Sequence, residues 1–138
     1  MKKTISIFMI VAVCFSLFSC RKSDVAKDIW ESAVYTENTE LGEGAKAVEV
    51  EVKAEDKSVT FKINTDKETL GEALIDHELI SGEQGAYGLY IKVVNGITAD
   101  YDVDKSYWSL SKNGEYMTTG VDGTEISGGE HFEITYTK

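Results

Sequence analysis

The chain has 138 residues, which is enough for one small domain but too few for two domains with separate cores. Its 24 acidic residues outnumber its 14 lysines and arginines, and the formal net charge is −10. Because the lysines beyond Lys3 are scattered singly among acidic residues, the composition argues against nucleic acid as a partner, which needs clustered Lys and Arg.

The N-terminal segment 1–19 has the pattern of a secretion signal. Lys2 and Lys3 precede an uncharged, apolar run from Ile5 to Phe18. A signal core needs only about 7 to 15 apolar residues, whereas a membrane-spanning helix needs about 20. We therefore expect this segment to direct export and to be cleaved, rather than to remain in the membrane.

Cys20 ends a Leu-Phe-Ser-Cys sequence that resembles the lipobox of bacterial lipoproteins. In a lipobox a small residue, here Ser19, precedes the cleavage site, and the Cys thiol accepts diacylglycerol. The resemblance implies an extracytoplasmic protein that begins at Cys20, carries acyl chains such as palmitate, and is lipid-anchored to a bacterial membrane. Cys14 is removed with the leader, so the mature chain has one cysteine and no disulfide.

Residues 20–44 are predicted to be a tether between the lipid and the domain. They are mostly polar, and their scattered apolar residues follow no regular period: Ile29, Trp30, Val34 and Tyr35. From Ala45 to Lys138 apolar periodicity continues to the end. We therefore assign 45–138 to the folded domain.

The domain begins with a pattern typical of a β-hairpin. Apolar residues alternate with charged or polar ones from Val48 to Val52 and again from Val59 to Ile63, on either side of the polar turn 55–57. These two segments predict a pair of antiparallel strands.

One short amphipathic helix is predicted next. Thr65 followed by Glu68 matches a capping box, and four residues then share one face at helical spacing before Gly82 ends the run: Leu70, Ala73, Leu74 and His77.

The remaining segments predict further strands. Tyr87 to Val94 is rich in β-branched and aromatic residues, and Asn-Gly turn signals occur at 95–96 and 113–114, the second after the strand-like Tyr107 to Leu110. A last strand is predicted from Phe132 to Tyr136. This order predicts an α+β, β-grasp-like domain: an antiparallel or mixed sheet with one helix packed on one face.

The sequence offers little for catalysis or metal binding. His77 lies on the predicted apolar helix face and His131 opens the last strand, without a nucleophile paired to either. The acidic segment 100–104 resembles the start of a calcium loop, but Lys105 and Ser111 occupy positions that need Gly and Glu. We expect a non-catalytic protein without a metal site, and a solvated acidic turn at 100–104, with weak calcium binding as the alternative.

Aromatic residues gather around the two Asn-Gly turns: Tyr87, Tyr90, Tyr107, Trp108 and Tyr116. Most of them could simply pack the sheet, because strands favour aromatic residues. Alternation, however, sends Tyr107 and Trp108 to opposite faces, so one of them must point away from the face that the helix covers. An exposed aromatic ring is suited to stacking on a ligand.

Four segments carry a resemblance to a known family: 87–91, 94–97, 107–110, and the closing part with Gly120-Val121 and Gly128 to Ile134. Over 45–138 the chain resembles the C-terminal domain of transcobalamin and intrinsic factor. It is more similar still to bacterial surface lipoproteins with this transcobalamin-like domain. In the carriers this domain is a β-rich lid over one face of the corrin ring, while a larger helical domain holds the other face.

The resemblance implies a ligand-binding module that contributes to cobalamin or other corrinoid capture near an uptake system, and that has no cofactor of its own. Trp108 and Tyr107 match the family motif as ligand-binding residues, and Tyr90 and Tyr116 are added because of the aromatic clustering. The alternative is a cell-surface adhesion or protein-interaction module without a small-molecule ligand.

Overall fold

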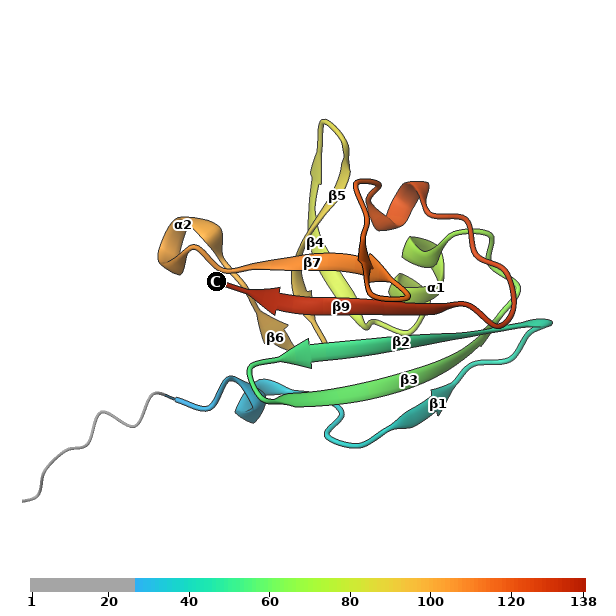
Figure 1. Cartoon of the computed structure of the whole chain (residues 1–138), viewed down its shortest axis with the longest axis horizontal. Helices are drawn as coiled ribbons and strands as arrows, with labels where there is room; N and C mark the ends of the chain where they lie inside the picture. Colours follow the sequence, from blue (N-terminus) through green and yellow to red (C-terminus); the bar gives the residue numbers. More distant parts are fainter. Residues whose placement is uncertain (1–26) are drawn as a thin grey trace, which may run out of the picture.

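A computed structural model describes residues 27–138 (Figure 1). The predicted signal 1–19 and the lipidation residue Cys20 lie outside this range. The described part has six strands in one sheet, in the order β1-β3-β2-β9-β7-β8. These strands are β1 (Thr39–Leu41), β2 (Lys46–Ala54), β3 (Lys57–Thr65), β7 (Tyr107–Lys112), β8 (Glu115–Tyr116) and β9 (His131–Thr137).

A second, three-stranded sheet has the order β4-β5-β6, with β4 (Ile80–Gly85), β5 (Gly88–Val94) and β6 (Ile97–Thr98). The helices are short: α1 (Leu70–Asp76) and α2 (Tyr101–Asp104), with 3₁₀ turns η1 (Ile29–Ser32) and η2 (Val121–Gly123). The protein is therefore an α+β fold dominated by sheet. None of the helices in residues 27–138 is long and apolar enough to cross a membrane.

The centre of the large sheet is the predicted β2–β3 hairpin beside the last strand. Val50 of β2 is opposite Phe61 of β3 in an antiparallel pair and opposite Phe132 of β9 in a parallel pair. Side chains alternate between the two faces of a strand, so these three residues share one face, where all are fully buried. The predicted hairpin and closing strand are confirmed, and the sheet is mixed.

Helix α1 and the small sheet supply the other side of the core. Leu70 and Leu74 of α1 and Val94 and Ile97 of the small sheet belong to the same buried cluster as the valines of β2. This sheet was not predicted as a separate unit. Its first strand, β4, was missed because it contains Gly82 and Gly85, and glycine is usually unfavourable inside a strand. Glycine is needed at position 82 because the backbone of Tyr90 lies very close. A Cβ at this position would be 1.9 Å from the Tyr90 carbonyl oxygen.

Both predicted Asn-Gly turns are present. Asn95 and Asn113 have φ angles of 50°, and Gly96 and Gly114 have φ angles of 78° and 80°. Positive φ at both central residues is the requirement of the tight turn that matches the strand twist, and Asn and Gly are the residues that tolerate it best.

The capping box was predicted one helical turn too early. Thr69, not Thr65, caps α1: its hydroxyl accepts from the Glu72 N–H at 3.3 Å, and the Glu72 carboxylate accepts from the Thr69 N–H at 3.3 Å. Thr65 remains the last residue of β3, opposite Lys46. The helix also ends at Asp76, before Gly82, because the chain turns directly into β4.

The described part of the predicted tether belongs to the fold. Trp30 is buried and its Nε1 donates to the Ala54 carbonyl at 2.9 Å, while the Asn95 side chain donates to the Tyr35 carbonyl and accepts from its N–H at 2.8 and 2.9 Å. Strand β1 then pairs parallel to β3. The folded unit therefore begins at about Asp28, not at Ala45. The boundary at Ala45 was based on apolar periodicity, whereas residues before it are held in the fold by a few long-range contacts that leave no periodic pattern in the sequence.

Candidate functional site

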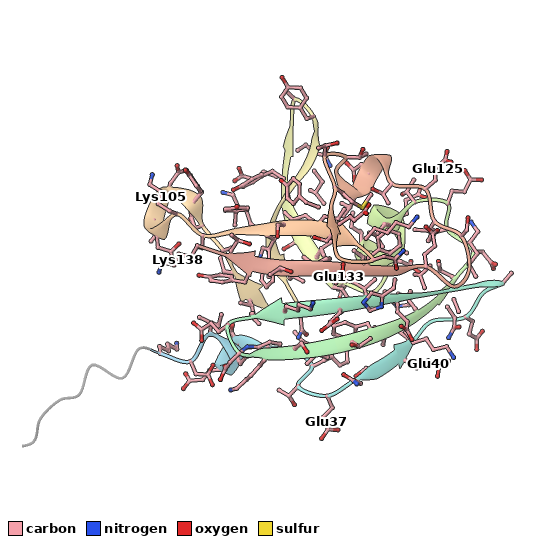
Figure 2. All side chains as sticks on the ribbon, viewed as in Figure 1. Glu37, Glu40, Lys105, Glu125, Glu133 and Lys138 are labelled. Atoms are coloured by element: carbon pink, nitrogen blue, oxygen red, sulfur yellow. The ribbon has the colours of Figure 1, made fainter. Side chains whose placement is uncertain are left out.

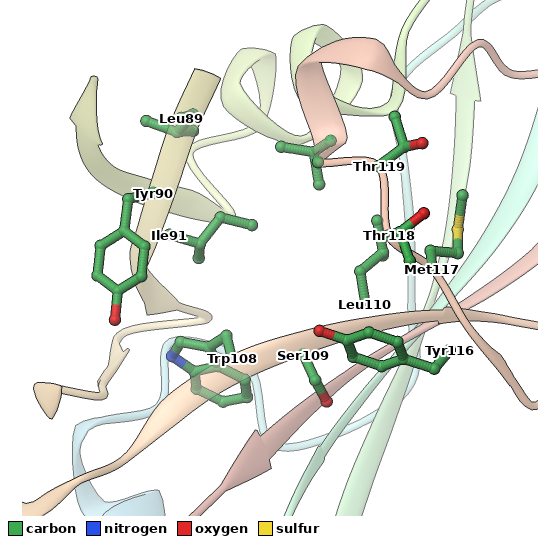
Figure 3. A pocket seen from close by; sticks show the side chains of 12 residues that line it. Leu89, Tyr90, Ile91, Trp108, Ser109, Leu110, Tyr116, Met117, Thr118 and Thr119 are labelled. Carbon is green, nitrogen blue, oxygen red and sulfur yellow. The ribbon is translucent and has the colours of Figure 1, made fainter. Parts of the chain in front are cut away.

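A hollow of about 180 Å³ lies between β5 and the β7–β8 hairpin, and we call it the aromatic hollow (Figure 3). It brings together three of the four predicted ligand-binding residues, Tyr90, Trp108 and Tyr116. The rest of its lining comes from the same strands and from the segment after β8: Leu89, Ile91, Ser109, Leu110, Met117, Thr118, Thr119, Gly120 and Val121.

Strand β7 places Trp108 at the base of the hollow. Trp108 and Leu110 are opposite Tyr136 and Ile134 of β9, on the apolar face of the large sheet. The Tyr136 ring packs edge-on against the indole, with ring centroids 5.5 Å apart. Trp108 is only 9% exposed, whereas Tyr116 is 70% and Tyr90 44% exposed.

Tyr107 lies outside the aromatic hollow. As alternation predicted, its side chain is on the opposite face from Trp108, where its ring centroid is 6.5 Å from that of Tyr101. The structure therefore does not bring Tyr107 together with the other three aromatic residues.

The rim of the hollow is formed by residues that the sequence did not single out. The Met117 N–H donates to the Leu110 carbonyl at 2.9 Å, which continues the β7–β8 hairpin into the Thr118-Thr119 segment. On the other side, the Asp122 carboxylate accepts from the Leu89 N–H at 2.9 Å. Leu89 lies in the segment 87–91 that carries the family resemblance, whereas Met117, Thr118 and Thr119 are signalled only by their proximity to Tyr116 along the chain.

The hollow can offer stacking and hydrogen bonds but no charged partner, because its lining contains no Asp, Glu, Lys, Arg or His residue. Tyr and Thr hydroxyl groups are available at its rim. Trp108 Nε1 is a buried donor without a hydrogen-bond partner within the described part of the chain. An uncharged ligand with a flat apolar surface and polar edges suits these groups.

The second cluster of polar side chains is on the open face of the large sheet. His131 Nδ1 is 3.2 Å from a Glu49 carboxylate oxygen, and His131 Nε2 is 3.5 and 3.7 Å from oxygens of Glu51 and Glu133. Figure 2 shows Glu133 in the middle of this sheet, where its carboxylate also accepts from the Gly114 N–H. His77 lies elsewhere, as the C-cap residue that follows α1.

The acidic segment 100–104 forms a mostly exposed helical turn, in which Asp100 precedes the single turn of α2. The Asp100 carboxylate caps this helix by accepting from the Asp102 N–H, and the Asp104 carboxylate accepts from the Ser106 hydroxyl and N–H. Lys138 approaches Asp104 at 3.6 Å, and Figure 2 shows Lys105 and Lys138 beside α2. Two of the carboxylates thus serve the local backbone.

Comparison with known families identifies the C-terminal half. Residues 67–138 match the model of a family described as "Domain of unknown function (DUF4430)". The chain belongs to the DUF4430 family. The DUF4430 segment contains every residue that lines the aromatic hollow, while β1, β2 and β3 precede it.

Solved structures extend the likeness to most of the described residues. A Ruminococcus gnavus ATCC 29149 protein, named a "putative metal binding protein", is 38% identical, with a TM-score of 0.65 over 68% of this chain and 98% of its own. Haptocorrin in complex with Cbi is 19% identical, with a TM-score of 0.58 over 71% of this chain. The match spans 26% of haptocorrin, and at this identity it shows a shared fold. None of the curated proteins compared matches the chain significantly.

The transcobalamin-like character predicted from the sequence is thus confirmed at the level of fold. The name of the Ruminococcus gnavus protein raises the question of a metal site in this DUF4430 chain. Residues 27–138 contain no group of three or more His, Cys, Asp or Glu side chains arranged to hold a metal ion.

Proposed function

We propose that this protein is a non-catalytic binding module that covers one side of a flat, mostly apolar ligand, and that the ligand is a corrinoid. The observation that carries the proposal is the convergence of Tyr90, Trp108 and Tyr116 on one uncharged hollow. The shared fold of haptocorrin, which was solved with Cbi, supports a corrinoid in preference to other flat ligands.

The size of the hollow favours partial coverage of the ligand. Pockets that enclose a small molecule usually have volumes of about 300–1,000 Å³, whereas the aromatic hollow has about 180 Å³. A ligand as large as a corrin would place one edge or one side chain in it and leave the rest exposed. A second protein, such as a component of an uptake system, would then cover the other side.

The strand order is consistent with a β-grasp core. The β2–β3 hairpin, α1, and then β7 and β9 follow in sequence, and β9 lies parallel to β2 in the middle of the sheet. In our proposal β1, β8 and the small sheet are additions to this core, and the small sheet supplies the β5 wall of the hollow.

We further propose that a lipid on Cys20 anchors the protein to a bacterial membrane in an extracytoplasmic location. Since the fold begins at about Asp28, seven residues separate it from the lipid-bearing cysteine. The eight residue-to-residue steps from Cys20 to Asp28 span at most about 28 Å when fully extended. The module would therefore act close to the membrane surface, where an uptake system operates.

The test is a titration of the mature chain from Cys20, with Cys20→Ser to prevent lipidation, against dicyanocobinamide and cyanocobalamin. Tryptophan fluorescence and calorimetric heat should both saturate. Tyr116→Ser should weaken binding, because it removes an exposed ring from the hollow. The matched control is Tyr87→Ser, which removes a fully exposed ring at the β4–β5 turn, outside the hollow. Absence of saturation up to about 1 mM corrinoid, equivalent to ~4 kcal/mol of binding, would exclude solitary capture.

An adhesion or protein-interaction module is the second candidate. The β4–β5 hairpin projects from the rest of the molecule (Figure 1), and Tyr87 at its turn is completely exposed. An exposed aromatic residue on a projecting hairpin is suited to protein contacts. In this case Tyr87→Ser would reduce attachment of the lipidated protein to cells or matrix, while Tyr116→Ser would leave it unchanged.

A further inference from the structure

Trp108 has a buried hydrogen-bond donor without an acceptor. The chain contains two tryptophans, and the other one, Trp30, donates from Nε1 to the Ala54 carbonyl at 2.9 Å. Trp108 is only 9% exposed, and its Nε1 has no hydrogen-bond partner within residues 27–138. Since nearly all buried polar groups in proteins are paired, an unpaired indole N–H requires an explanation.

The position of the nitrogen supplies one. Figure 3 shows Nε1 on the edge of the indole that is turned toward Tyr90, and both residues line the aromatic hollow. The edge-on contact with Tyr136, at 5.5 Å and an interplanar angle of 77°, fixes the ring in this orientation. Neither Tyr90 nor any other described residue is a hydrogen-bond partner of this nitrogen. The nitrogen has almost no accessible surface in the free protein, so a ligand oxygen reaches it only after neighbouring side chains, such as the 44% exposed Tyr90, move aside.

The charges around the hollow define the acceptor. A carboxylate or phosphate would find no cation among the lining residues, and it would enter a protein with a net charge of −10. Removing an anion from water without a counter-charge is strongly unfavourable. A neutral carbonyl oxygen avoids this cost and can still accept a hydrogen bond from Trp108.

We propose that Trp108 Nε1 donates a hydrogen bond to a neutral carbonyl oxygen of the bound ligand, of the amide class. This inference rests on the proposed function and deepens it: the amide side chains around a corrin supply such acceptors. Trp108 is thus a residue that selects the polar edge of the ligand, while Tyr90 and Tyr116 contact its apolar surface.

The test is a ¹H–¹⁵N spectrum of the mature Cys20→Ser chain, in which each tryptophan gives one indole signal. On titration with dicyanocobinamide, the Trp108 indole proton should move downfield, and its exchange with solvent should slow. The Trp30 indole is the internal reference, because it is already bonded to Ala54 in the free protein, and its signal should stay in place.

A substitution separates the hydrogen bond from the ring. Trp108→Phe keeps an aromatic side chain but removes the donor, and it should bind dicyanocobinamide about tenfold more weakly, as expected for one lost hydrogen bond. Dicyanocobyrinic acid, in which carboxylates replace the amides, should bind the wild-type chain more weakly than dicyanocobinamide.

The outcomes distinguish the two proposals. If the wild-type chain does not bind any corrinoid, the proposed function is wrong, and this inference with it. If it binds while the Trp108 indole signal stays in place or Trp108→Phe binds equally well, only the hydrogen bond is wrong. Equal or tighter binding of the carboxylate form would overturn the neutral class of acceptor. Should Trp108→Phe fail to fold, the wild-type spectra still decide the question.

Discussion

The Asp122 carboxylate accepts a hydrogen bond from the backbone N–H of Leu89 at 2.9 Å, across 33 residues of sequence. Asp122 belongs to η2 in the closing part of the chain, and Leu89 belongs to β5 of the small sheet. Gly88, with φ of 105°, lets the strand approach so closely that a Cβ would be 3.2 Å from the same carboxylate. This contact joins the two walls of the aromatic hollow.

Asp122→Ala should therefore loosen the hollow. We expect the free energy of unfolding to fall by about 1 kcal/mol, because one hydrogen bond at an exposed site is lost, and corrinoid binding to weaken. Urea unfolding and calorimetric titration measure the two effects. Asp122→Asn is the matched control, since its amide oxygen can still accept from Leu89. If Asn and Ala behave alike, the hydrogen bond is not what holds the walls together.

Trp30 provides a test of where the fold begins. Trp30→Ala removes a buried indole and its bond to Ala54, and should lower the free energy of unfolding by about 3–5 kcal/mol. Chemical denaturation followed by circular dichroism measures this change. Val34→Ala, at a side chain that is 67% exposed in the same segment, should change stability by less than about 0.5 kcal/mol. If both substitutions change the free energy of unfolding by similarly small amounts, the segment around Trp30 acts as a tether and is not part of the folded unit.

Local chemistry explains which parts of the fold could be predicted. The Asn95-Gly96 turn needs positive φ angles, which Asn and Gly adopt easily whatever surrounds them. In β2, the alternation of apolar and polar residues indicates directly which face of the strand is buried. The opposite directions of Tyr107 and Trp108 follow from the same two-residue period. None of these inferences needs a partner that is distant in sequence.

The errors occurred where the partner is distant or where two local signals are equal. Thr65 and Thr69 are each followed three residues later by glutamate, and only the pairing of Thr65 with Lys46 assigns it to a strand. Trp30 is fixed by Ala54, 24 residues later. The hollow combines both difficulties, because its β5 wall and its Thr118-Thr119 rim are brought together by packing between two sheets.

Asp104 should show a titration that depends on Ser106. The hydrogen bond from the Ser106 hydroxyl, with that from the Ser106 N–H and the nearby Lys138 ammonium, lowers the pKa of the Asp104 carboxyl. Because the pKa is lowered in the folded state, the stability that this carboxylate contributes is complete above the unfolded-state value, about 3.9, and is lost as the pH falls through the folded value. The stabilising contact between Asp104 and Ser106 is therefore complete at neutral pH and is weakened in acid.

Ser106→Ala should raise the pKa of Asp104 toward its usual value, since the hydroxyl that makes the first contribution is gone. Carboxyl ¹³C chemical shifts, followed from pH 6 downward, measure the midpoint in both proteins. Asp102, whose carboxylate lies on the same helical turn, is the reference signal. An unchanged Asp104 midpoint in Ser106→Ala would show that the hydroxyl does not stabilise the ionised form.

A steric block tests whether the ligand occupies the aromatic hollow at all. Thr118 is exposed at its rim, and Thr118→Trp would fill much of a space of about 180 Å³. We expect at least a tenfold loss of corrinoid affinity with little change in stability, because an exposed side chain is enlarged without disturbing the core. Thr98→Trp, at an exposed position of β6 outside the hollow, is the control. If Thr118→Trp binds as tightly as Thr98→Trp, the ligand binds at another surface, and the projecting β4–β5 hairpin with Tyr87 becomes the first place to search.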